Sequence, residues 1–191
     1  MQDLKKHKLI LASKSPRRQY LLKELGLKFA VHTKEVEENF PENLKAQEIP
    51  LYLCQKKADA FEEELTDDTI VITADTIVWI NNQVLNKPEN FNDAVRMLKL
   101  LSGKMHEVYT GVCLKSKHKT KTFYALTKVY FKELSQQEIE YYINNFNPYD
   151  KAGAYGAQEW IGYIAVEKIE GSYFNVMGLP VRELYEELLK F

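Results

Sequence analysis

Apolar and polar positions along the first part of the chain change in short blocks that predict strands and helices in alternation. Residues 9–12 are small or apolar and predict a short buried strand. Ser15 and Pro16 follow as an N-cap and first helical position, and they predict a helix that Gly26 ends. A second short strand is expected at 28–32.

The middle of the chain predicts an amphipathic helix and a hairpin. A polar, acidic loop at 33–49 precedes a helix beginning near Pro50. Its inward positions are expected to be Leu51, Cys54, Ala58, Phe61 and Leu65. Residues 69–80 are rich in β-branched side chains and predict a strand, which Asn81-Asn82 turns back into residues 83–85.

The second half continues the alternation of helices and strands. The expected elements are a helix at 92–101, strands near 106–115 and 121–132, a helix opened by a Ser135–Glu138 capping box, a strand near 162–168 and a helix from about 180. Because strands and helices are interspersed with hairpins, we expect an α/β fold with a mixed sheet rather than repeated βαβ units. We interpret residues 1–191 as a single domain.

Composition narrows the class of protein. The chain has 191 residues, 26 basic and 27 acidic, so its net charge of −1 gives no general attraction to nucleic acid or to an anionic membrane. Two cysteines occur without a CxxC pair, and no stretch approaches the length of an apolar membrane span or a signal peptide. We therefore expect a cytoplasmic protein with two buried, reduced thiols.

The stretch LILASKSPRR, residues 9–18, predicts an anion site. A strand leads into a helix whose first turn holds Ser15, Arg17 and Arg18, and Ser13 precedes it. The free N–H groups of a helix start and the arginine side chains favour a bound anion. The alternative is a capped helix with surface arginines. No GxxxxGK[ST] loop is present, so ordinary P-loop chemistry has no support.

A second group of charges surrounds Asp75. A lone carboxylate in an apolar strand is costly unless it is paired, hydrogen-bonded or bound to a metal. Asp75 is therefore expected either at a strand end or bulge, or in a pocket with cations, and the plainer alternative is a structural ion pair. The hairpin is expected to return Lys87 towards Asp75. On the helix from Pro50, Lys57 lies at the edge of the apolar stripe, whereas Lys56 points away from it. Glu37 and Glu38, in the acidic loop, are expected either to join Asp75 in holding Mg²⁺ or Mn²⁺, or to be plain surface.

A glycine-bearing loop at 151–158 ends in Gln158, whose amide can both donate to and accept from the edge of a nucleobase. Together with the serines, arginines, lysines and carboxylates, this inventory suits a polyphosphate held with a metal. The histidines form no recognisable serine or cysteine triad.

These motifs, in order, resemble the Maf family of nucleoside triphosphate pyrophosphatases. The matching segments are LASKSPRR, VEENFP, QKKADA, ADTIV, NKPEN, LSGKMHEVYTGV, DKAGAYGAQ and GSYFNVMGLP. The resemblance implies a Maf / ITPase-like α/β fold, an elongated, twisted mixed sheet flanked by helices with two lobes around a central cleft. It also implies hydrolysis of a nucleoside triphosphate to the monophosphate and pyrophosphate, a divalent cation (Mg²⁺ or Mn²⁺), and a homodimer.

The same resemblance implies catalytic and substrate-binding roles for particular residues. The family's motif positions fall on Ser13, Arg17, Arg18, Glu38, Lys57, Asp75 and Lys87. Asp75 is the family's proposed proton acceptor, and it either takes a proton from water or holds the metal. The branch that favours dTTP and UTP resembles this chain at Arg17 or Arg18, at Thr76 and at Gln158. The 7-methyl-GTP branch tends to carry tryptophan in place of Thr76 and glutamate in place of Gln158.

Two departures and two rival functions remain open. Glu159-Trp160 stand where the family usually continues with glycine, and Asn90 replaces a common aspartate at an expected helix cap. One rival is a non-catalytic nucleotide-binding regulator of cell division, and another is the same reaction on 7-methyl-GTP. A nucleic-acid-binding module is disfavoured because the aromatic residues fall at core spacing.

Overall fold

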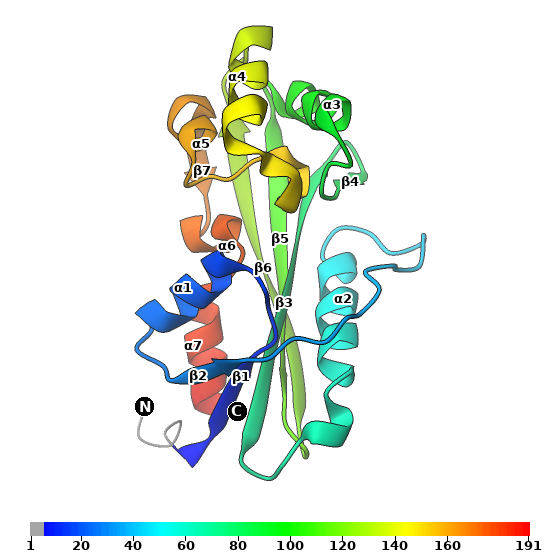
Figure 1. Cartoon of the computed structure of the whole chain (residues 1–191), viewed down its shortest axis with the longest axis vertical. Coiled ribbons are helices and arrows are strands. Elements are labelled where there is room, and N and C mark those ends of the chain that lie inside the picture. Colours follow the sequence, from blue (N-terminus) through cyan, green and yellow to red (C-terminus); the bar gives the residue numbers. More distant parts are fainter. Residues whose placement is uncertain (1–5) are drawn as a thin grey trace. The chain divides into compact units, whose positions relative to one another are not determined.

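A computed structural model describes residues 6–191 (Figure 1). The first five residues, on which the expected absence of a signal peptide partly depends, lie outside the described residues. The described chain forms two compact units. Unit 1 comprises residues 6–75, 110–125 and 178–191, and unit 2 comprises residues 76–109 and 126–177.

The described residues contain one seven-stranded sheet with the order β2-β1-β3-β5-β6-β7, and β4 pairs with β3. Its strands are β1 (Lys8–Leu11), β2 (Phe29–Val31), β3 (Thr69–Ile80), β4 (Gln83–Leu85), β5 (Met105–Lys115), β6 (Thr120–Phe131) and β7 (Val166–Glu170). Strand β1 is parallel to β2 and to β3, whereas the β3–β4 and β6–β7 pairs are antiparallel. The predicted mixed α/β fold is therefore confirmed.

Helices flank the strands in both units. They are α1 (Pro16–Glu24), α2 (Glu48–Asp59), α3 (Phe91–Leu101), α4 (Gln136–Phe146), α5 (Trp160–Ala165), α6 (Tyr173–Met177) and α7 (Val181–Lys190). In unit 1, α2 lies on one side of the strands and α1 and α7 on the other (Figure 1). Among residues 6–191, no helix combines the length and apolar character needed to cross a membrane.

Helix α2 packs closely on β5 because Gly111 has no side chain. A Cβ atom at Gly111 would lie 2.4 Å from the Pro50 carbonyl oxygen, which is closer than real contacts allow. Next to this contact, Cys54, Ala58 and Cys113 form a buried cluster, and both thiols are free as predicted. Burial raises the pKa of Cys113 to about 12, so this thiol is protonated at neutral pH.

Unit 2 has its own core, and the sequence signals at its edges are confirmed. Ser135 and Glu138 form the predicted capping box of α4. Asn90 caps α3 by accepting a hydrogen bond from the Asp93 N–H at 3.0 Å, so its substitution for aspartate keeps a cap. The predicted helix at 92–101 is present as α3, and four of its residues are buried, namely Ala94, Met97, Leu98 and Leu101.

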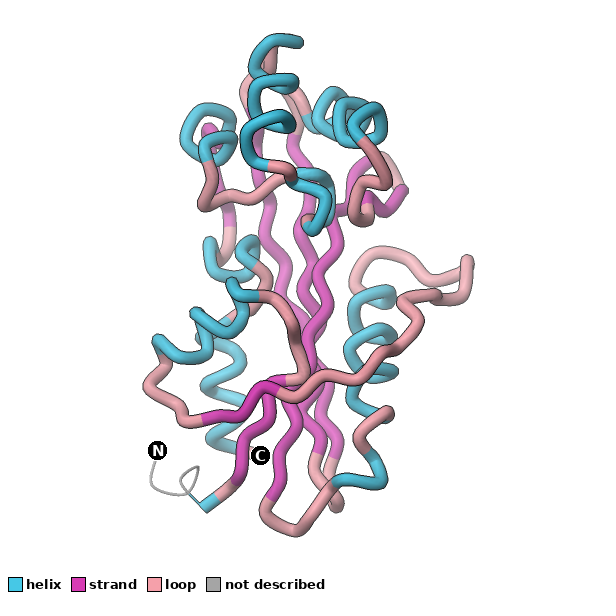
Figure 2. The backbone as a smooth tube through the Cα atoms, viewed as in Figure 1, coloured by secondary structure: helices cyan, strands magenta, loops and turns pink. Residues whose placement is uncertain are grey.

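Two element predictions are wrong in part. Helix α2 ends at Asp59, so Phe61 and Leu65 are buried after the helix, and Leu53 rather than Leu51 faces the core. The strand predicted at 162–168 is the helix α5 followed directly by β7 (Figure 2). Buried Ile161 and Ala165 are four residues apart, which is the helical period that the alternation in this segment concealed.

Candidate functional site

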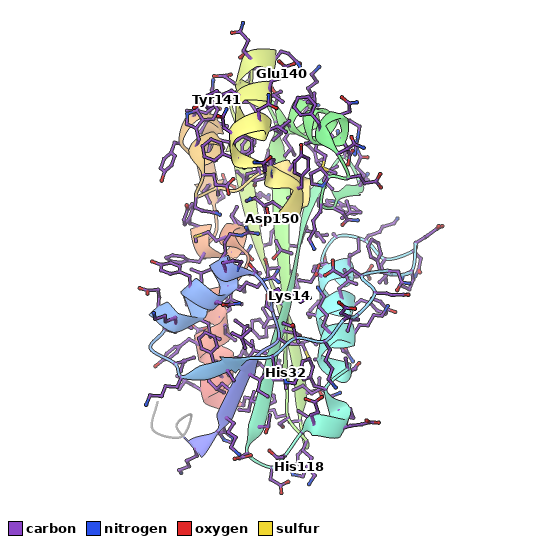
Figure 3. The ribbon with its side chains drawn as sticks, viewed as in Figure 1. Lys14, His32, His118, Glu140, Tyr141 and Asp150 are labelled. Carbon is purple, nitrogen blue, oxygen red and sulfur yellow. The ribbon has the colours of Figure 1, made fainter. Side chains whose placement is uncertain are left out.

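The predicted anion site at the start of α1 is present in unit 1. Ser15 is the N-cap, and its Oγ accepts a hydrogen bond from the Arg18 N–H at 3.4 Å. The buried Ser13 Oγ accepts one from the Ser15 N–H at 3.2 Å. Each hydroxyl therefore receives a backbone hydrogen bond and retains its own proton to donate. Lys14 lies between them in the loop that joins β1 to α1 (Figure 3).

Arg18 connects α1 to the strand that carries Asp75. Its Nε donates to the Gly178 carbonyl at 2.7 Å, and its Nη1 donates to the Ala74 carbonyl at 2.9 Å. Burial lowers the pKa of Arg18, and the nearby Asp75 charge opposes that change. Arg18 thus fixes the start of α1 beside Asp75, a structural role that the sequence did not indicate. Arg17 precedes it and is partly exposed.

Lys57, Asp75 and Glu38 meet in unit 1 although they come from a helix, a strand and a loop. Lys57 Nζ lies 2.6 Å from Asp75 Oδ1 and 2.8 Å from Glu38 Oε1. The Lys57 and Asp75 side chains are only 16% and 12% exposed, whereas that of Glu38 is 47% exposed. Asp75 therefore lies within β3 beside a cation, as both a charged pocket and a structural ion pair predict. Lys56 is also partly buried but contacts Asn39 instead, and the choice of Lys57 as the lysine of the site stays a prediction.

The packing of α2 explains why Lys57 reaches Asp75. Thr73 Oγ1, two residues before Asp75 on β3, donates to the Cys54 carbonyl of α2 at 2.6 Å. This bond fixes the C-terminal half of α2 against β3, and the close contact of Pro50 with Gly111 fixes the first turn of α2 against β5. Lys57 lies three residues after Cys54, in the last turn of α2.

The remaining predicted residues lie in unit 2. Thr76 follows Asp75 on β3, and Lys87 lies two residues beyond the end of β4. The predicted approach of Lys87 to Asp75 stays a prediction. Gln158 lies in the turn before α5, and its Oε1 is buried without a hydrogen-bond partner among the described residues. A buried acceptor in this state costs about 1–3 kcal/mol unless a ligand or water satisfies it.

The carboxylates suit a divalent cation only in part. Among residues 6–191, no group of three or more His, Cys, Asp or Glu side chains is placed to hold a metal. However, Asp75 and Glu38 converge on one cationic group, Lys57 Nζ. Mg²⁺ is usually held by one or two carboxylates together with waters and substrate phosphates, so this pair fits that kind of site.

The sequence missed a second charged cluster, in unit 2. Lys151 is buried and pairs with Asp150 and Glu159, and Glu159 also accepts a hydrogen bond from the Tyr142 hydroxyl. The one available signal was the unusual Glu159-Trp160 after Gln158.

The chain is similar to known proteins over nearly its whole length. The family model described as Maf-like protein matches residues 8–191. A dTTP/UTP pyrophosphatase of Phocaeicola vulgatus is 54% identical over 191 residues, which cover 100% of this chain and 99% of that protein. Proteins of the same name from Flavobacterium johnsoniae and Parabacteroides distasonis are 54% and 48% identical, covering 98% and 100% of this chain and 96% and 100% of their own.

Among solved structures, a nucleoside-triphosphatase / dITP/XTP pyrophosphatase from Mycobacterium abscessus shows a remote likeness. It is 12% identical with a TM-score of 0.37, covering 65% of this chain and 72% of that one. We draw nothing from a likeness at this level.

Proposed function

The chain belongs to the Maf family, and from this premise we propose that it hydrolyses dTTP and UTP to the nucleoside monophosphate and pyrophosphate. The observation that carries the proposal is the meeting of Lys57, Asp75 and Glu38 in unit 1. The relatives that bear this activity in their names match essentially the whole chain at about half identity, which supports the same reaction here.

In the proposed reaction, water attacks the α-phosphorus and the bond from that phosphorus to the bridging oxygen breaks, so that pyrophosphate leaves. The start of α1, with Ser13 and Arg17, binds phosphate oxygens through hydroxyl, backbone N–H and guanidinium donors. Arg18 contributes charge there while holding α1 in place. Lys57 stabilises the negative charge that grows on the departing oxygen, and Lys87 binds further phosphate oxygens.

Asp75 receives the proton of the attacking water in this proposal. A base of this kind must lie within hydrogen-bond reach of the water, and Asp75 is held in place by Lys57 through Oδ1 alone. That bond leaves Oδ2 to take the proton. Positioning and charge stabilisation by groups fixed in advance supply most of the rate enhancement in such reactions.

We propose Asp75 and Glu38 as the residues that hold a divalent cation, Mg²⁺ or Mn²⁺. The bound cation supplies positive charge that offsets the charge of the triphosphate and of the leaving pyrophosphate. Lys57, which both carboxylates contact in the structure, then shares them with that cation.

Base preference is proposed to depend on Thr76 and Gln158, with Arg17 and Arg18. Thymine and uracil present an N3–H donor between two carbonyl oxygens. The unpartnered Gln158 Oε1 is an acceptor that suits this N–H, and the amide NH₂ can donate to a neighbouring carbonyl.

The cellular setting is part of the same proposal. We propose a cytoplasmic homodimer that binds neither nucleic acid nor membrane stably. Two free, buried cysteines support a reducing compartment, and the near-zero net charge supports the absence of nucleic-acid binding. Sedimentation of the purified chain measures the oligomeric state.

A substrate panel tests the function. Common ribo- and deoxyribonucleoside triphosphates and 7-methyl-GTP are incubated with Mg²⁺ or Mn²⁺, and the products are separated by chromatography. We expect dTMP or UMP with pyrophosphate, preferentially from dTTP and UTP, and loss of turnover with a chelator. Tight nucleotide binding without turnover would favour the regulatory alternative, and preferential cleavage of 7-methyl-GTP would move the chain to the other branch.

A further inference from the structure

Lys151 is the most deeply buried charged side chain of the segment that leads to Gln158. Its side chain is 8% exposed, and its Nζ lies 2.6 Å from Asp150 Oδ1 and 3.0 Å from Glu159 Oε1. A lysine is rarely buried to this extent unless carboxylates pair with it. Lys151 and Glu159 are the two ends of the segment 151–159, which contains Gln158. Their ion pair therefore joins the two ends of this loop.

Tyr142 joins the closed loop to α4. Its hydroxyl donates to Glu159 Oε2 and accepts from the Gly156 N–H at 3.0 Å, and the Glu159 N–H donates to the Gly156 carbonyl at 3.0 Å. Burial, and then the bond to Glu159, raise the pKa of Tyr142, so the hydroxyl keeps its proton and remains the donor. These three hydrogen bonds form a ring around residues 156–159.

The backbone of the loop leaves little space for other arrangements. A Cβ atom at Gly156 would lie 3.0 Å from Glu159 Cδ and 3.1 Å from Lys151 Cε. Gly153 has a φ of +68°, and its N–H donates to the Asn86 carbonyl at 3.1 Å. Asp150 marks the start of this segment, just after α4, in Figure 3.

Gln158 belongs to the segment 156–159 that these hydrogen bonds join, and it directly precedes Glu159. Its Oε1 is buried and has no hydrogen-bond partner among the described residues. An acceptor held in one place discriminates between bases, because thymine and uracil present an N3–H donor whereas cytosine presents an N3 acceptor. If the loop were loose, the backbone of Gln158 would shift relative to the base, its Oε1 would no longer meet the N3–H in one place, and the discrimination would fall.

We propose that Tyr142, Lys151 and Glu159 are positioning residues that hold Gln158 Oε1 as an acceptor, and that they thereby set the preference for thymine and uracil over cytosine. This inference rests on the proposed function, in which Gln158 contacts the base. It gives a role to the Glu159 that stands where the family usually has glycine. None of the three residues is proposed to touch the substrate.

The test measures binding of non-hydrolysable nucleotides to the full chain. Dissociation constants are measured for the α,β-imido analogues of dUTP and dCTP, together with the inhibition constant of inorganic tripolyphosphate, which has no base. The variants are Gln158→Ala, Tyr142→Phe, Glu159→Ala and the milder Glu159→Gln. Tyr141→Phe is the matched control, because Tyr141 is a half-exposed tyrosine of the same helix whose ring packs on Trp160 (Figure 3).

We expect Tyr142→Phe and Glu159→Ala to lower the preference for the dUTP analogue about tenfold, with Glu159→Gln intermediate. The tripolyphosphate constant should stay within about twofold of wild type in every variant, because only the base contact is disturbed. Tyr141→Phe should match the wild type throughout.

Several results would overturn the inference, and they differ from failure of the proposed function. If Gln158→Ala loses the preference while the Tyr142 and Glu159 variants keep it, the positioning role is wrong and the base contact stands. An equal loss of tripolyphosphate binding would show a general structural effect instead. A wild type without any preference refutes both the Gln158 contact and the positioning role, whereas failure of the enzyme to cleave any nucleotide refutes the proposed reaction alone.

Discussion

The partly buried Lys57 in unit 1 and the buried Lys151 in unit 2 each pair with two carboxylates, but the two clusters are assembled differently. The partners of Lys57, Glu38 and Asp75, come from a loop and a strand far from α2 in the sequence. Lys151 pairs with the residue directly before it and with Glu159, all within one loop.

The difference indicates what each cluster does. Charges brought together from three separate segments cost stability to desolvate, so their convergence suits a site that must meet a charged ligand. Charges that pair within one loop, and that a tyrosine hydroxyl also joins, suit a brace for that loop. We therefore assign chemistry to the Lys57 cluster and positioning to the Lys151 cluster.

The largest effect is expected from Asp75→Asn. The amide keeps the shape of the side chain but neither accepts a proton from water nor carries charge for a cation. We expect kcat to fall about 100-fold or more, measured as release of pyrophosphate from dTTP. Nearly normal turnover would show that Asp75 acts neither as the base nor as a metal ligand.

A matched pair of lysine substitutions tests the comparison itself. Lys57→Met should lower kcat about 100-fold, because a fixed positive charge at the phosphates is lost. Lys151→Met should leave kcat within about threefold and lower the free energy of unfolding by about 2 kcal/mol, because a carboxylate loses its buried partner. Steady-state kinetics and urea unfolding of both variants measure this difference. Equal losses of kcat would contradict the assignment of separate roles.

A smaller effect is expected at His106, a buried polar group of unit 2 that has no charged partner within residues 6–191. Its Nε2 is 2.8 Å from the Tyr155 hydroxyl, and its ring meets the edge of Phe131. Burial lowers the pKa of His106 to about 3. The unfolded chain takes up a proton near the ordinary histidine pKa of about 6.5, whereas the folded chain does not, so stability is lost as the pH falls through this range.

When the pH is lowered from about 7 to about 5, the titration of His106 should lower the free energy of unfolding by about 2 kcal/mol. Urea unfolding of the wild type and of His106→Gln at both pH values isolates the contribution of His106 to the free energy of unfolding. All other titratable groups contribute equally in the two proteins, so their contributions cancel. An equal dependence on pH in the two proteins would show that His106 takes up its proton over the same pH range in the folded chain as in the unfolded chain.

Most elements of the fold were predicted because their signals are local. Asn81 and Asn82 adopt positive φ values of 51° and 57°, as a tight hairpin turn requires, and β3 spans the predicted residues 69–80. The start of α1 followed from Ser15 and Pro16 in the same way. The helix α5 was missed because a short apolar segment fits helical and strand patterns alike.

The candidate site was predicted only as an inventory of residue types. Nothing local in the sequence places the carboxylate of Glu38 on Lys57, because their contact depends on how a loop passes α2. The carbonyl contacts of Arg18 and the bond from Tyr142 to Glu159 are likewise tertiary. The spacing of residue types along the sequence does not predict such contacts between distant segments.

Hydrolysis of dTTP in water enriched with ¹⁸O tests the central claim most directly, with mass spectrometry of both products. Attack on the α-phosphorus predicts that the label enters dTMP and that the pyrophosphate is unlabelled. Label in pyrophosphate or in inorganic phosphate, with dTMP unlabelled, would contradict the proposed reaction at the α-phosphorus.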